Sequence, residues 1–218
     1  MINEPFHKEN LRIKDKIFAL DFKLILLILF LGIISLFAMY SSEQGKFGYY
    51  TQNHLYRFCV FFILFLGISL IRVQFWFKSA YIFYFLTLIL LLAVDFFGVT
   101  ASGSKRWINI FFFNLQPSEL MKVGLIIFLA RYYNKIPLEY VSSIRHMILP
   151  LVALIIPVFL VAMQPDLGTA ILIAAGGFSV IWLAGLRIKY FLYSFVILIC
   201  LIPVGISFLK PYQKSRIL

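Results

Sequence analysis

The sequence predicts an all-α, polytopic helical membrane protein with about seven transmembrane helices. Of its 218 residues 62% are hydrophobic and only 13% are charged, and the mean hydropathy is +0.96. The charged share is about half that of soluble domains, so the chain cannot cover its surface against water and lipid is its solvent. The apolar residues fall in runs of about 17 to 20, the length that crosses ~30 Å of hydrocarbon. Because backbone groups in lipid must be satisfied internally, such runs predict helices rather than barrel strands.

The first element is a polar, mildly basic segment, residues 1–21. No clean small-residue cleavage site follows the next apolar run, so this segment predicts a retained cytoplasmic tail rather than a signal peptide. A transmembrane bundle is expected over 22–208, with spans at 22–40, 55–71, 80–98, 117–133, 147–163, 168–186 and 190–208. Residues 209–218 then begin an external loop.

The net charge of +11 would suggest nucleic acid in a soluble protein. Here it predicts basic residues that flank membrane spans and meet anionic lipid, and no nucleic-acid partner. Loops on the amino-terminal side hold eleven Lys and Arg, and loops on the opposite side hold six. The amino terminus is therefore expected in the cytoplasm and the carboxyl terminus outside.

Cysteine and histidine give no sign of a metal or disulfide framework. Cys59 and Cys200 each lie inside an apolar run, which predicts buried apolar side chains. His7, His54 and His146 are scattered without metal-ligand spacing. No phosphate-binding loop, nucleophile elbow or dinucleotide fingerprint is present. We therefore predict no metal site and no evident cofactor, and leave a divalent cation open.

Charges concentrate in "KRWINIFFFNLQPSELMKVG", residues 105–124, between two apolar runs. Pro117 suits the first turn of a helix, where its missing N–H costs nothing. Glu119 then lies in the first turn, where the helix dipole favours a carboxylate, and Lys122 follows three residues later on the same face. The two residues form either a self-neutralising structural pair or part of a polar cavity. We favour the cavity, because ionisable groups within a membrane usually mark functional sites.

A second Gln-Pro-acid motif echoes the first. "QPSE" opens the span at 117–133, and "QPD" precedes the span at 168–186. Both spans are expected to run from outside to inside, which places Glu119 and Asp166 at outer mouths of descending helices. Asp166 is either a helix N-cap alone or a member of the same cavity. Asp95, near the outer end of the span at 80–98, is expected only to bond nearby backbone or a partner helix.

Three cations are expected near the outer mouth of the fourth span. Arg106 offers a planar fork suited to phosphate or diphosphate, and Lys105 and Lys122 add two ammonium groups. Such a site suits an anionic lipid head group. Trp107 is either an interfacial belt residue or part of the entrance. Arg57 is expected to snorkel rather than join the site.

These stretches resemble a known family. "GSKRWINIFFFNLQPSELMKVGLIIFLARYY" resembles the signature of the SEDS (shape, elongation, division and sporulation) proteins. "VAMQPDLGTAILI" and "PYQKSRIL" resemble its rod-shape-determining RodA branch. The resemblance implies the first part of a ten-helix fold in the bacterial inner membrane.

The resemblance also implies an activity and partners. The family polymerises lipid II, an undecaprenyl-diphosphate-linked substrate, into peptidoglycan for cell elongation and rod shape. It works with a class B penicillin-binding protein and other elongation-complex membrane proteins. Charged cavity positions of the family match Arg106, Glu119, Lys122 and Asp166, and its supporting motif positions match Gln116, Pro117, Ser118, Gln164 and Pro165. The aspartate expected as general base lies beyond Leu218, so the catalytic residue is unknown here and the chain is expected to be truncated and inactive alone.

Two other functions stay open from sequence. The repeated Gln-Pro-acid openings would also suit a flippase for lipid-linked precursors. A non-catalytic fragment or scaffold of the cell-wall synthesis complex is the third hypothesis. The sequence does not decide between a stable product, a split gene and a decayed fragment, nor the oligomeric state or the lipid II variant used.

Overall fold

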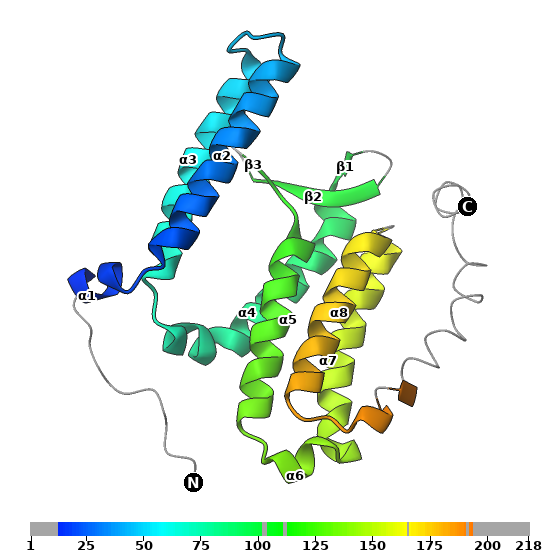
Figure 1. Ribbon diagram of the computed structural model, residues 1–218. Coiled ribbons are helices and arrows are strands. Elements are labelled where there is room, and N and C mark those ends of the chain that lie inside the picture. The colour runs from blue at the N-terminus through cyan, green and yellow to red at the C-terminus, as the bar shows by residue number, and fades with distance from the viewer. Residues whose placement is uncertain (1–12, 102–103, 111–112, 165, 191, 194–218) are drawn as a thin grey trace. The chain divides into compact units, whose positions relative to one another are not determined.

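The computed structural model describes residues 13–101, 104–110, 113–164, 166–190 and 192–193 (Figure 1). Its elements are, in chain order, α1 Ile13–Phe18, α2 Phe22–Ser42, α3 Tyr49–Ser69, α4 Val73–Phe97, β1 Val99–Ala101, β2 Ser104–Ile110, β3 Phe113–Leu115, α5 Pro117–Asn134, α6 Leu138–Val141, α7 Ile144–Met163 and α8 Leu167–Leu183. Over these ranges, α2, α4 and α7 are long and apolar enough to cross a membrane, and α8 is apolar but 17 residues long. The protein is thus a predominantly helical, multi-pass membrane protein. It divides into two compact units, Met1–Phe75 and Trp76–Leu218.

The first unit is built on the pair α2 and α3. Asp21 caps α2, because its carboxylate accepts the backbone N–H groups of Lys23 and Leu24 at 3.0 and 3.2 Å. Midway along α2, a Cβ on Gly32 would lie 2.2 Å from the Phe58 ring on α3. Glycine therefore lets the two helices approach closely at this level.

The turn between α2 and α3 is closed by Glu43. Gln44 and Gly45 adopt left-handed φ values of +58° and +74°, which reverses the chain. The Glu43 carboxylate then accepts the N–H groups of Tyr50 and Thr51, both at 3.0 Å, and the Thr51 hydroxyl. The Thr51 hydroxyl contributes most to lowering the pKa of Glu43 below its ordinary value, and the N–H bonds of the α3 amino terminus add to it. The carboxylate thus caps α3 from the end of α2.

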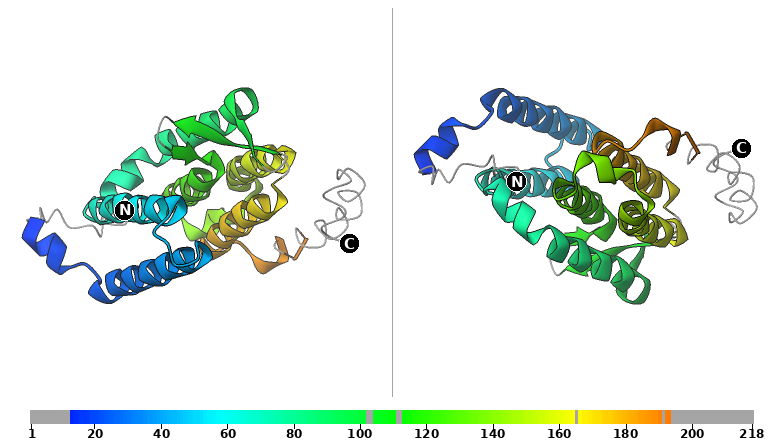
Figure 2. Two further views of the ribbon diagram at one scale, coloured as in Figure 1. Left: turned by 90° about the horizontal axis from the view of Figure 1, so that it is seen from above. Right: turned by 90° about the horizontal axis from the view of Figure 1, so that it is seen from below.

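The second unit is a helix bundle with α5 packed against both α7 and α8 (Figure 2). Its core consists of side chains that are at most 2% exposed, among them Leu91, Met121, Leu125, Leu154 and Ile173. A Cβ on Gly177 of α8 would lie 2.5 Å from Leu154 of α7, so this glycine permits close packing there.

A small antiparallel sheet connects α4 to α5 in the order β1-β2-β3. Trp107 of β2 pairs with Val99 of β1, and Ile108 pairs with Leu115 of β3. The predicted all-α class describes the helices, and the structure adds this small sheet, which the sequence analysis did not predict. Near a membrane surface unpaired backbone groups are costly, and strand pairing satisfies them over a short connection.

The observed helices and the predicted spans differ mainly at two starts. Helices α2, α5, α7 and α8 begin within three residues of the predicted ranges 22–40, 117–133, 147–163 and 168–186. Helix α3 starts six residues before residue 55 and α4 starts seven residues before residue 80, because segments that mix polar with aromatic residues extend both helices beyond the predicted apolar runs. The span at 190–208 lies mostly outside the described residues, and the tail at 1–12 and the loop at 209–218 lie wholly outside them.

Cys59 is exposed on α3, so the expectation of a buried cysteine was wrong at this position. In an apolar solvent an outward thiol carries no penalty that would drive it inward. Cys200 and His7 lie outside the described residues.

Candidate functional site

One end of the second unit gathers the starts of two helices and the sheet. Helices α5 and α8 both begin there, β2 lies beside them, and α6 lies at the opposite end of the unit (Figure 1). The amino-terminal ends of α5 and α8 direct backbone N–H groups and positive dipole ends toward this region, which favours carboxylates. The polar residues of both Gln-Pro-acid motifs meet at this end.

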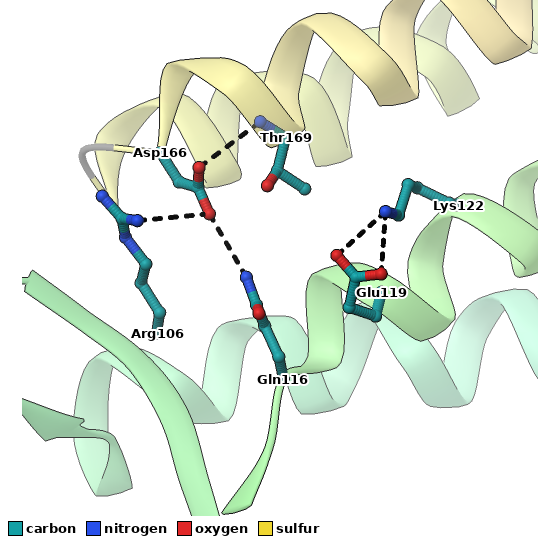
Figure 3. Close-up of polar contacts among 6 residues, drawn as sticks. All are labelled: Arg106, Gln116, Glu119, Lys122, Asp166 and Thr169. Atoms are coloured by element: carbon teal, nitrogen blue, oxygen red, sulfur yellow. Dashed lines mark hydrogen bonds and ion pairs between the residues drawn. The ribbon is translucent and has the colours of Figure 1, made fainter. Parts of the chain in front are cut away.

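Asp166 makes contacts to three segments (Figure 3). It is the N-cap of α8, where its Oδ1 accepts the Thr169 N–H at 3.3 Å. Its Oδ2 accepts the Gln116 side-chain amide at 3.3 Å and lies 3.8 Å from Nη1 of Arg106 on β2. Only 12% of the Asp166 side chain is exposed, against 28% for Arg106. The carboxylate therefore holds a guanidinium, an amide and a helix start in fixed relation.

Glu119 and Lys122 form a second contact on the first turns of α5. Lys122 Nζ lies 2.9 Å from Oε1 and 2.8 Å from Oε2 of Glu119, the i,i+3 pairing that their spacing predicts. Glu119 is 54% exposed and Lys122 28%. This pair is more open than the one between Arg106 and Asp166.

Gln164 anchors the other side of the second motif. It is the C-cap of α7 and only 5% exposed. Its side-chain amide donates to the Leu91 carbonyl at 3.0 Å and to Asp95 Oδ1 at 3.4 Å, both on α4. Asp95 thus bonds a partner helix, and the chain between α7 and α8 is tied to α4 just before Asp166.

The other predicted residues lie around this core of contacts. Pro117 and Ser118 are buried in the first turn of α5. Lys105 and Trp107 flank Arg106 on β2, where Lys105 is exposed and Trp107 is half-buried. Pro165 lies outside the described residues. Arg57 is exposed on α3, in the first unit.

Sequence reasoning missed that Arg106 is carried by a strand. The residues from Lys105 to Ile110 do not alternate polar with apolar side chains, so the period-two pattern of a half-buried strand is absent from β2. In the described ranges no three His, Cys, Asp or Glu side chains are grouped to hold a metal ion. Chemically, the arrangement presents one guanidinium and one ammonium, each oriented by a carboxylate, which suits a multiply charged anionic group.

The family described as cell cycle protein, FtsW/RodA/SpoVE, matches residues 18–218. The chain belongs to this family. Among curated relatives, the peptidoglycan glycosyltransferase MrdB of Helicobacter pylori is 35% identical over 196 residues, which cover 88% of this chain and 49% of that protein. The MrdB of Escherichia coli is 36% identical over 136 residues, covering 62% and 36% respectively. The chain thus spans about half or less of the length of these relatives.

Two solved structures share the fold of this chain. A peptidoglycan synthase complex, whose structure describes coordination of polymerization and crosslinking, matches with a TM-score of 0.78 and 26% identity over 91% of this chain and 58% of that one. The rod shape determining protein RodA of Thermus thermophilus matches with a TM-score of 0.72 and 24% identity over 84% of this chain and 60% of that one. At this identity the second likeness concerns the fold alone.

Proposed function

We propose that this FtsW/RodA/SpoVE chain contributes the diphosphate-binding part of a peptidoglycan glycosyltransferase that polymerises lipid II during cell elongation. The observation that carries the proposal is the Asp166 cluster. In it the guanidinium of Arg106 from β2 lies against Asp166, the N-cap of α8, which also accepts the side-chain amide of Gln116, the N-cap of α5. The relatives named as peptidoglycan glycosyltransferases supply the reaction class.

In this proposal the residues act on the leaving group of a glycosyl transfer. An acceptor sugar hydroxyl attacks C1 of the donor, a general base takes its proton, and the undecaprenyl diphosphate departs. Arg106 and Lys122 stabilise the negative charge that develops on the diphosphate. Asp166 and Glu119 orient these cations. The resemblance assigns the base to an aspartate outside residues 1–218, so neither carboxylate is given that role.

The proposal includes an orientation and a partner. In this proposal the amino terminus lies in the cytoplasm and the Asp166 cluster lies near the outer surface of the inner membrane, which the excess of Lys and Arg in the amino-terminal-side loops supports. A cross-linking enzyme, a class B penicillin-binding protein, is the expected partner. The similarity to a synthase complex that couples polymerization with crosslinking supports this.

The test is polymerisation of labelled lipid II in proteoliposomes with that partner. Both the 218-residue chain and any longer product of its gene are assayed, because the chain spans about half of its relatives. In whichever product is active, Arg106→Gln should lower the rate about 100-fold, the effect of removing one charge-stabilising donor. Arg145→Gln is the matched control, since Arg145 is exposed at the opposite end of the unit.

Two results would contradict the proposal. Near-normal polymerisation by Arg106→Gln would remove the diphosphate role from the cluster. Transbilayer scrambling of labelled lipid II without any polymer, lost on Arg106→Gln, would instead favour the flippase, which the paired Gln-Pro-acid motifs also suit.

A further inference from the structure

Two buried prolines, Pro150 and Pro157, lie inside α7, the helix that spans Ile144–Met163. A proline has no N–H, so it leaves the carbonyl four residues earlier without its helical partner, and its ring bends the helix there. The freed acceptors are the carbonyls of His146 and Ala153. In a membrane such orphan groups must find other partners.

Both freed carbonyls accept a tyrosine hydroxyl from another helix. The Tyr84 hydroxyl of α4 donates to the Ala153 carbonyl at 2.8 Å, and Tyr84 is only 3% exposed. The Tyr132 hydroxyl of α5 donates to the His146 carbonyl at 3.1 Å. At each proline, α7 is therefore held by one hydrogen bond to a neighbouring helix.

We propose that Tyr84 is a positioning residue for the Asp166 cluster, an inference that rests on the proposed function of that cluster. Tyr84 bonds the carbonyl that Pro157 leaves free, and the helix runs only seven residues, about two turns, from Pro157 to Gln164. Gln164 bonds back to α4 at Leu91, so α4 holds the last part of α7 at two levels. Asp166 follows directly, and its place relative to Arg106 depends on where this segment ends.

Tyr132 provides an internal control. Its contact at Pro150 has the same chemistry, but it lies fourteen residues before Gln164, toward the α6 end of the unit. Loss of either hydroxyl leaves one carbonyl unsatisfied. Only the loss at Tyr84 is expected to displace the cluster.

The experiment compares Tyr84→Phe, Pro157→Ala, the double variant and Tyr132→Phe in the active product. Equilibrium unfolding is followed in SDS–detergent mixtures, and hydrogen exchange of the peptide spanning 164–170 is measured by mass spectrometry. Tyr84→Phe and Tyr132→Phe should each raise the unfolding equilibrium constant about 3- to 20-fold, as for the loss of other interhelical hydrogen bonds in membranes. Of these two variants, only Tyr84→Phe should also accelerate hydrogen exchange at residues 167–170. The expected acceleration is about fivefold, the effect of weakening an N-cap.

The double variant separates positioning from plain stability. With Pro157→Ala, a backbone N–H at position 157 satisfies the Ala153 carbonyl, so the double variant should return the unfolding constant to that of the unsubstituted protein. The constraint of the proline ring on the helix would be gone, so exchange at 167–170 should stay fast and lipid II polymerisation should stay about tenfold to a hundredfold low. If Tyr84 had only a structural role, the unfolding constant, hydrogen exchange and polymerisation would all recover together in the double variant.

Three outcomes would overturn the inference. They are full recovery of exchange in the double variant, no change in either readout on Tyr84→Phe, and equal acceleration of exchange by Tyr132→Phe. If the unsubstituted protein shows no polymerisation, the proposed function fails, whereas exchange and unfolding still decide the role of Tyr84.

Discussion

The substitution Asp166→Asn removes the charge of this side chain. It keeps a residue that caps helices well and deletes the ion pair with Arg106. At the observed 3.8 Å, two unit charges attract by about 1 kcal/mol in water and about 4 kcal/mol at an effective dielectric constant of 20. The side chains are 12% and 28% exposed, so the real value lies between these limits. After desolvation we expect a net coupling of about 1–2 kcal/mol. For the open Glu119–Lys122 pair, the surface value of about 0.3–0.5 kcal/mol applies.

A double-mutant cycle measures this coupling directly. Unfolding free energies in SDS–detergent mixtures are compared for the unsubstituted protein, Asp166→Asn, Arg106→Gln and the double variant. The same cycle with Glu119→Gln and Lys122→Gln is the matched control. If the coupling of Arg106 with Asp166 fell to 0.3 kcal/mol or less, or below that of the control pair, the assignment of a tight, partly desolvated cluster would be refuted.

Two further predictions concern the first unit. The stabilisation that Glu43 provides should be fully present above its ordinary pKa of 4.5 and be lost as the pH falls through its lowered folded-state pKa. Glu43→Gln should flatten this pH dependence of stability in acid titrations followed by circular dichroism. An unchanged pH profile would contradict the capping role of Glu43. Gly32→Ala should destabilise the protein by about 1–3 kcal/mol, because the new Cβ would lie 2.2 Å from the Phe58 ring. Gly67→Ala, with nothing within 4 Å of the new Cβ, should be neutral or stabilising in the same unfolding assay, and similar losses at both glycines would contradict the close-approach argument.

Local signals predict the helix starts at the candidate site well. Pro117 and Asp166 are start residues in their own right, one by its fixed φ and the other by its capping carboxylate. In the structure α5 spans Pro117–Asn134 and α8 spans Leu167–Leu183, so α5 begins at Pro117 and α8 directly after Asp166. The contact between Glu119 and Lys122 is equally local, since both lie on one helix.

Signals that depend on distant residues are weaker in sequence. Apolar length locates the middle of α3 and α4 but not their starts, because polar residues at an interface continue a helix without adding hydropathy. Nor does spacing decide which carboxylate faces Arg106. That pairing requires β2 to lie beside the start of α8, and β2 exists only through its pairing with β1 and β3.

The prolines of α7 show that a local sequence signal can identify free acceptors without identifying their donors. The sequence reveals which carbonyls Pro150 and Pro157 release, because the offset of four residues is fixed by helix geometry. It does not reveal the donors, since tyrosine hydroxyls on α4 and α5 reach those carbonyls only after the helices pack. The free carbonyls are therefore encoded locally, and the contacts that satisfy them are tertiary. If the cluster at Asp166 binds a diphosphate, its geometry depends on a residue as remote in sequence as Tyr84, and substitutions that preserve every charged side chain can still disable it.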